Sequence, residues 1–195
     1  MHNEPPVILQ ERTFRFGRAM AIYRIETEQR GRVFMRVDRS NYFNDERAVV
    51  VVDASRCLSA WRADCGPAWL GAVHAVVDPI NRVLNQRSPK RDRWLPYLSR
   101  KSWLRDFKFQ KTMDGFAHGA ENPVPLAKIG LSWGPPGAVV FIDGITRTLW
   151  LLANGASAFP VECEASIADT LSQAVGVEWA YPQTVQELLG AQFLG

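Results

Sequence analysis

A short segment in the C-terminal half carries residue types suited to holding an anion. Asp143 and Gly144 follow a run of β-branched and aromatic residues, and Thr146 and Arg147 stand in the first turn of the helix predicted after them. The first backbone N–H groups of a helix lack internal acceptors and lie at the positive end of its dipole. Glycine lets the backbone approach a ligand closely, and an Arg guanidinium forms paired hydrogen bonds with oxyanions. The segment 144–147 is therefore predicted to bind a phosphate or another oxyanion.

Ordinary helix-start chemistry explains the same residues without any ligand. Asp143 is suited to the N-cap, its glycine neighbour to a tight turn, and Arg147 to a solvated first turn. In a phosphate site, Asp143 is instead the candidate to hold Mg²⁺ or to orient a water molecule. Asp53, at the end of an earlier strand, is a weaker candidate acid. Glu162 and Glu164 follow the next strand and are predicted to lie on the surface.

The elements that position this segment alternate between strand and helix. Hydrophobic patterning predicts a strand over 138–142, a helix over 144–154 that ends at Gly155, a strand over 158–162 and a helix over 165–175. A short helix from Thr184 closes the chain. A right-handed parallel crossover is one arrangement that fits, although pattern alone does not order the strands.

The N-terminal part reads as a β-hairpin followed by a buried strand and helices. Apolar and polar residues alternate over 18–26 and 32–38, and a continuous Val run over 46–54 suits a strand covered on both faces. Asp53 or Ser55 is suited to cap the helix that follows. Further helical stretches are predicted over 68–77 and 79–84, and a Pro/Gly-punctuated connector over 119–137. We expect one domain, 1–195, with 1–84 as an N-terminal extension and hairpin and 85–195 as the core.

Positive charge is concentrated in one region between these parts. Residues 82–111 hold ten Lys or Arg against two Asp, a balance of +8 in a chain whose net charge is +3. Such a segment gains affinity for nucleic acid by releasing counterions, and its interleaved aromatics, among them Trp94, Tyr97, Trp103, Phe107 and Phe109, could stack on unpaired bases. Equally, the aromatics could be core residues with the basic side chains as a solvated rim. The candidate DNA-binding residues are Arg87, Lys90, Arg91, Arg93, Arg100, Lys101, Arg105 and Lys108.

Cysteine and histidine usage predicts neither disulfides nor a metal centre. Cys57, Cys65 and Cys163 are odd in number and widely spaced, so we expect reduced thiols in or near the core. The three histidines show no ligand spacing. No signal peptide and no apolar run long enough to span a bilayer is seen, so the sequence predicts a cytoplasmic location.

The segment "FIDGITRTLWLLANGASAFPV" resembles the core motif of the ParB/sulfiredoxin superfamily, in which a strand leads into Asp-Gly-x-x-Arg, an apolar helix and a further strand. The chain length and the lead-in "NPVPLAKIG" further resemble the plasmid fertility-inhibition factors of the Osa/FiwA type. The resemblance implies an α/β fold, a mixed sheet flanked by helices with an N-terminal hairpin extension. It implies that Gly144, Ile145, Thr146 and Arg147 hold the phosphates of ATP, with Mg²⁺, and that Arg147 and Asp143 serve catalysis.

The same resemblance implies a plasmid-encoded factor that suppresses conjugative or T-DNA transfer through type IV secretion, with ATPase and DNase activity and single-stranded DNA as the favoured substrate. Sulfiredoxins carry Gly-Cys-His-Arg at this turn; Ile145 and Thr146 replace the Cys and His, which excludes sulfinic-acid reduction. Two alternatives stay open. One is a non-catalytic nucleotide- or DNA-binding module; the other is a protein that docks on a secretion coupling ATPase, and so lies peripherally at the inner membrane.

Overall fold

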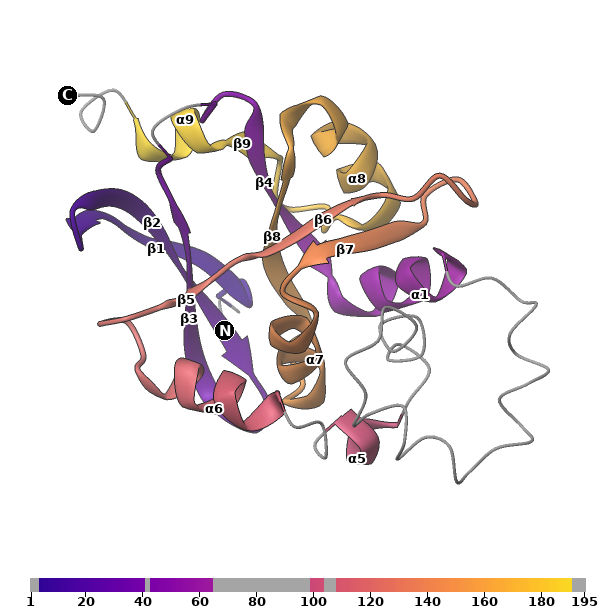
Figure 1. Ribbon diagram of the computed structural model, residues 1–195, viewed down its shortest axis with the longest axis horizontal. Coiled ribbons are helices and arrows are strands. Elements are labelled where there is room, and N and C mark those ends of the chain that lie inside the picture. The colour runs from indigo at the N-terminus through magenta and orange to yellow at the C-terminus, as the bar shows by residue number, and fades with distance from the viewer. Residues whose placement is uncertain (1–3, 41–42, 65–98, 104–107, 191–195) are drawn as a thin grey trace.

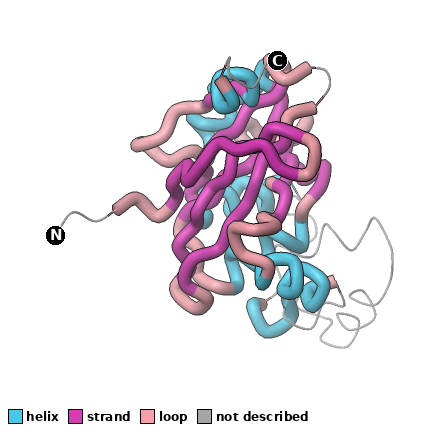
Figure 2. The backbone as a smooth tube through the Cα atoms, turned by 90° about the vertical axis from the view of Figure 1, so that its left-hand side faces the viewer, coloured by secondary structure: helices cyan, strands magenta, loops and turns pink. Residues whose placement is uncertain are grey.

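The computed structural model describes residues 4–40, 43–64, 99–103 and 108–190 of the chain. Two β-sheets dominate this part, with helices packed against them (Figure 1). Figure 2 shows the strands facing the viewer and most helical turns behind or below them. The structure thus confirms the predicted mixed α/β class with an N-terminal hairpin; membership of the ParB/sulfiredoxin superfamily stays a prediction.

The first sheet, sheet A, is built around the predicted hairpin. Its two strands pair antiparallel with Thr27 opposite Gly31, as the alternation of apolar residues indicated. An additional N-terminal strand, which the sequence analysis did not predict, pairs with the hairpin and carries a bulge between Leu9 and Glu11. The order across sheet A is β1 (Val7–Arg15), β2 (Arg18–Thr27), β3 (Gly31–Asp38) and β5 (Val124–Pro125).

The second sheet, sheet B, has the Val-rich strand near its centre. Val49, Val50 and Val52 are buried there, as expected for a strand covered on both faces. The predicted connector 119–137 was wrong in part, because it contains two strands, one of which lies inside sheet B. The order is β7 (Val139–Asp143), β6 (Ala127–Leu131), β8 (Ala158–Glu164), β4 (Arg47–Asp53) and β9 (Gln183–Thr184).

The pairing of these strands settles the crossover that pattern left open. β6 is parallel to β8, whereas β7 is antiparallel to β6. The parallel crossover therefore runs from β6 to β8 through β7 and the helix after it, and β7 itself is antiparallel to β8. β4, from the N-terminal part of the chain, pairs antiparallel with β8 over its full length.

The helices close the core around the two sheets. α1 (Ala54–Asp64) and α8 (Ala168–Val175) pack against each other and against strands of sheet B. α6 (Phe109–Ala117) and α7 (Ile145–Ala153) lie side by side (Figure 1), where the rings of Phe116 and Trp150 stack with centroids 4.1 Å apart. The shorter helices are α5 (Arg100–Trp103), the 3₁₀ turn η3 (Ala165–Ile167) and α9 (Val185–Leu189).

Local capping chemistry explains where several helices begin and end. The Asp53 carboxylate accepts a hydrogen bond from the Arg56 amide at 2.8 Å, so the prediction that Asp53 caps α1 is confirmed. Thr184 and Glu187 form a capping box at the start of α9. α7 ends at Ala153, and Gly155 follows with φ +77°, as its position predicted. The helical stretches predicted over 68–77 and 79–84 lie outside the described residues.

Candidate anion-binding site

The turn that joins β7 to α7 depends on the glycine at its centre. Gly144 has φ +86°, a conformation that L-residues with a side chain rarely adopt. A Cβ atom at this position would lie 2.6 Å from the Cα of Ala127 on the neighbouring strand β6. Glycine therefore allows α7 to start directly against sheet B, which places its first turn at the end of β7.

The first amides of α7 have no acceptor within the described part of the chain. The first backbone bond of the helix runs from the Thr148 amide to the Gly144 carbonyl at 3.0 Å, and no side chain caps this end. The N–H groups of Ile145, Thr146 and Arg147 consequently stay unpaired among the described residues. Three unpaired donors at the positive end of a helix dipole form a suitable environment for an anion.

The Arg147 side chain folds back over this turn. Its Nη2 donates to Asp143 Oδ2 at 2.5 Å, and its Nη1 donates to the carbonyl of Pro125 at 3.0 Å. The side chain of Arg147 is 16% exposed and that of Asp143 is 67% exposed. Because a guanidinium carries five N–H donors, these two bonds fix its position and leave further donors available. The structure thus brings together the predicted residues Asp143, Gly144 and Arg147.

The interpretation of Asp143 as the N-cap of this helix is wrong. Gly144 occupies the N-cap position, and Asp143 Oδ1 accepts only from the adjacent Gly144 amide, at 2.7 Å. Asp143 and Asp53 each end a strand of sheet B, and these two strands, β7 and β4, run in the same direction. Two further strands lie between them, a separation of about 14 Å or more at ordinary strand spacing. They are therefore too far apart to act as a pair of catalytic carboxylates.

Lys128 belongs to this site, although the sequence analysis did not single it out. On β6 it lies in register with Asp143 on one side and with Glu162 on the other. Its Nζ is 3.2 Å from Glu162 Oε1, and its side chain is 49% exposed. The ammonium is half exposed and pairs with Glu162 on the neighbouring strand β8, while the backbone of Lys128 lies beside that of Asp143 at the end of β7. The alternation within "LAKIGL" could have indicated this strand, but the surrounding Pro and Gly residues obscured it.

Glu162 is buried, so its predicted surface position is wrong, whereas Glu164 is exposed as expected. Arg47 holds the Glu162 carboxylate with two hydrogen bonds of 2.9 and 2.8 Å. Burial by itself would raise the pKa of Glu162, but the hydrogen bonds and charge of Arg47, together with Lys128, outweigh burial and lower the pKa. Glu162 is therefore an ionised partner that fixes Arg47 and Lys128 rather than a proton donor.

Most of the predicted DNA-binding segment lies outside the described residues. Arg100 and Lys108 are exposed, and Lys101 lies in α5. Trp103 and Phe109 are each 6% exposed, which confirms a core position for these two aromatics and rules out their stacking on bases. The remaining candidates and aromatics of the segment fall outside the description: Arg87, Lys90, Arg91, Arg93, Arg105, Trp94, Tyr97 and Phe107.

The cysteines follow the prediction where the structure describes them. Cys57 and Cys163 are buried free thiols, and burial, with nearby carboxylates, raises the pKa of each to about 12. Cys65 lies outside the described residues. No cluster of three or more His, Cys, Asp or Glu side chains that could hold a metal ion occurs in the described part of the chain. Among the described helices, none is long and apolar enough to cross a membrane.

Comparison with known proteins points to one family. The sequence pattern of the plasmid fertility inhibition factor family matches residues 49–176, more than half of the chain. Protein Osa of Shigella flexneri is 42% identical over 88 residues, which are 43% of this chain and 44% of that relative; the match thus spans less than half of the relative's length. A crystal structure of the oncogenic suppression activity protein, a plasmid fertility inhibition factor, solved as a gold(I) cyanide derivative, is also similar. It superposes with a TM-score of 0.61 at 26% identity, over 87% of this chain and 76% of that one.

Proposed function

The chain belongs to the plasmid fertility inhibition factor family, and from this premise we propose that it blocks conjugative or T-DNA transfer through type IV secretion by binding ATP and cleaving DNA. The observation that carries the nucleotide part is the start of α7. There the amides of Ile145, Thr146 and Arg147 are unpaired beside the Arg147 guanidinium. A phosphate group matches this set of donors in both charge and hydrogen bonding.

The residues present fit a nucleotide with its magnesium ion. The unpaired amides and Arg147 would hold phosphate oxygens, and the half-exposed Lys128 would add positive charge next to them. Asp143, the most exposed carboxylate at the turn, would contribute the protein oxygen to Mg²⁺, which commonly takes one or two carboxylates plus phosphate and water. When bound, the ion would neutralise phosphate charge.

Hydrolysis of the nucleotide would require Arg147 to stabilise charge on the phosphoryl group and Asp143 to position the attacking water. The Arg147 guanidinium, held in place by Asp143 and Pro125, would stabilise negative charge that develops on the phosphoryl oxygens. Asp143 would orient the attacking water. Removal of one charge-assisted contact of this kind costs about 10²–10³-fold in rate. Lys128 and Glu162 would not touch the reacting atoms and would act as positioning residues for the neighbouring turn.

Action on DNA would use the basic segment. Residues 82–111 carry a local charge of +8, and the exposed Arg100 and Lys108 bring part of it to the surface of the described chain. Charge of this density favours phosphate backbones, and single-stranded DNA is the natural target of a factor that attacks a transferring strand. We propose Arg87, Lys90, Arg91, Arg93, Arg100, Lys101, Arg105 and Lys108 as the contacting side chains.

A second candidate is a module that binds without catalysis. Thr146 stands where related turns carry a histidine, so the turn has no imidazole to transfer a proton. In addition, the Asp143 carboxylate is paired with Arg147. Such a module would bind a nucleotide or DNA through the same turn without cleaving either. The other alternative is a protein that inhibits transfer by docking on a secretion coupling ATPase through the basic residues of 82–111.

ATP turnover and degradation of single-stranded DNA, each with and without Mg²⁺, separate the two candidates. Wild type is compared with Arg147→Ala and with Arg32→Ala, a matched control whose arginine is exposed on β3 and, within the described part of the chain, pairs with Glu26 alone. Turnover that is lost in Arg147→Ala and kept in Arg32→Ala supports the enzyme. ATP binding without turnover supports the module. If ATP does not bind, the nucleotide proposal is wrong.

A further inference from the structure

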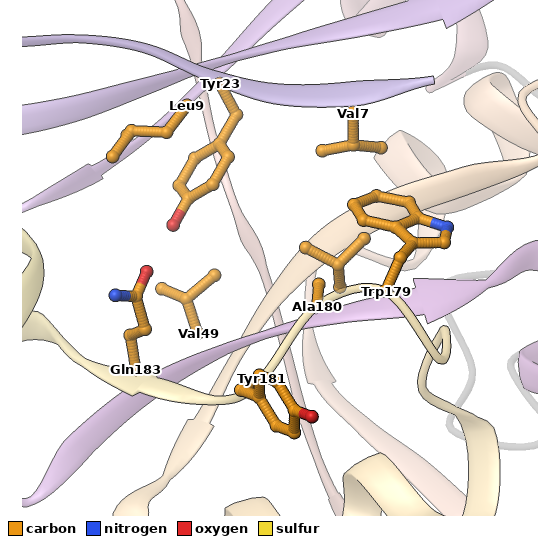
Figure 3. A pocket seen from close by; sticks show the side chains of 9 residues that line it. Val7, Leu9, Tyr23, Val49, Trp179, Ala180, Tyr181 and Gln183 are labelled. Atoms are coloured by element: carbon orange, nitrogen blue, oxygen red, sulfur yellow. The ribbon is translucent and has the colours of Figure 1, made fainter. Parts of the chain in front are cut away.

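A small cavity lies between the two sheets, at the edge of sheet B opposite the β7–α7 turn. It has a volume of about 300 Å³, at the lower end of the range for small-molecule sites. Its floor is apolar: Val7 and Leu9 come from β1, and Val49 from β4. The segment that precedes β9 forms its mouth (Figure 3). The size of this cavity suits a ligand of one or two rings.

The hydroxyl of Tyr23 faces this cavity. The residue is only 5% exposed, but its hydroxyl oxygen is not one of the buried atoms that lack a hydrogen-bond partner in the described part of the chain, so it is reached from the cavity. Figure 3 shows the hydroxyl directed into the space between the lining side chains. Burial raises the pKa of Tyr23 well above its usual range, so the group stays a neutral donor and acceptor. A ligand atom in the cavity can therefore hydrogen-bond to this hydroxyl as donor or as acceptor.

A carboxamide and an indole converge on the same space. Gln183 lies opposite Val49 in the sheet, and its side chain points toward the Tyr23 hydroxyl (Figure 3). A carboxamide offers a donor and an acceptor side by side, which matches the edge of a heterocyclic base. Trp179, half exposed at the mouth, provides an aromatic face on which a planar ring can stack.

We propose that this cavity binds a nucleobase, with the ring against Trp179 and its polar edge hydrogen-bonded to Tyr23 and Gln183. A purely hydrocarbon ring, such as a phenylalanine side chain, would form no hydrogen bond with either Tyr23 or the exposed Gln183. None of the described residues that line the cavity is cationic, so recognition is of the base rather than of a phosphate. The base could come from a free nucleoside or nucleotide, or from single-stranded DNA.

This site is independent of the proposed nucleotide site. The cavity borders β4 and β9, whereas the Gly144 turn follows β7 at the other edge of sheet B. Nucleosides, which lack phosphate, would occupy the cavity without help from Arg147. Failure of either proposal therefore leaves the other one standing.

Calorimetric titration of the full chain with adenosine, guanosine, cytidine and thymidine tests the proposal. At least one nucleoside should bind, and Tyr23→Phe and Gln183→Leu should each weaken binding about fivefold to tenfold by removing one hydrogen bond. Trp179→Ala should weaken it tenfold or more. The control Trp133→Ala, which removes a fully exposed tryptophan from the β6–β7 loop, should leave binding unchanged.

A second titration with a short single-stranded oligonucleotide identifies the source of the base. Weakening of oligonucleotide binding by Trp179→Ala assigns the cavity to DNA, and the absence of that effect assigns it to free nucleosides. Thermal unfolding of Tyr23→Phe should match wild type, because the hydroxyl faces the cavity. Two results would overturn the proposal. One is that no nucleoside binds at millimolar concentration, and the other is that N-acetyl-tyrosinamide, an aromatic compound without a base edge, binds as tightly as the nucleosides.

Discussion

Replacement of Gly144 by alanine should destabilise the protein and also distort the β7–α7 turn that is proposed to bind phosphate. At φ +86° an alanine is strained by about 1–2 kcal/mol. The new Cβ would also lie 2.6 Å from the Cα of Ala127, and a backbone atom inside sheet B cannot move aside cheaply, which adds about 1–3 kcal/mol. We expect a loss of about 2–5 kcal/mol in the free energy of unfolding, or roughly 4–20 °C in Tm.

Gly31→Ala is the matched control for this substitution. Gly31 has φ +64°, but a Cβ at that position would meet no atom within 4 Å. Its alanine variant should therefore lose only the strain part, about 1–2 kcal/mol. Urea unfolding of both variants, followed by tryptophan fluorescence, gives the difference that the contact with Ala127 contributes. Equal losses in the two variants would refute the close approach of α7 to sheet B.

Three further predictions concern the contacts that hold the fold. Glu162→Gln should cost about 2–3 kcal/mol at pH 7, because the partly buried Arg47 guanidinium loses its carboxylate counterion. Because the folded pKa of Glu162 is lowered, the stability that its ionised form adds is present above the ordinary pKa of 4.5 and is lost as the pH falls through the folded pKa. Urea unfolding at decreasing pH should therefore show the free energies of unfolding of wild type and Glu162→Gln converging. The control Glu164→Gln should change the free energy of unfolding little at any pH. Arg56→Ala should lower the free energy of unfolding by about 1 kcal/mol in a thermal melt, since its guanidinium donates to three carbonyls at the C-terminal end of α8. In a Cys65→Ser background, a thiol reagent at pH 8 should label the two buried thiols only after denaturant is added; rapid labelling of the folded protein would contradict their burial.

Local signals made much of this fold predictable from the sequence. The alternation in the hairpin, the Val run of β4 and the glycines around α7 each indicate structure within a few residues. β1 escaped prediction because the bulge after Leu9 breaks its alternation. β6 escaped because Pro and Gly residues on both sides resemble a loop, and only its pairing with β7 and β8 makes it a strand.

In the candidate site, too, residues that are close in sequence were predictable and residues brought in by long-range pairing were not. Asp143, Gly144 and Arg147 are neighbours in sequence, so their spacing was enough to bring them together. The burial of Glu162 depends on Arg47, which comes from a strand 115 residues earlier in the chain. Lys128 joins the site only through its register with the neighbouring strands. Pairings between distant segments leave no mark in the local sequence, and the structure was needed to find them.

The central claim is that the unpaired amides at the start of α7 hold the phosphates of a nucleotide. The direct measurement is a titration of ¹⁵N-labelled protein with Mg·ATP, followed by the amide resonances of Ile145, Thr146 and Arg147. These three resonances should shift together as ATP is added and stay in place when adenosine is added instead. If they do not move while ATP binds, or if adenosine moves them equally, the phosphates are not held there.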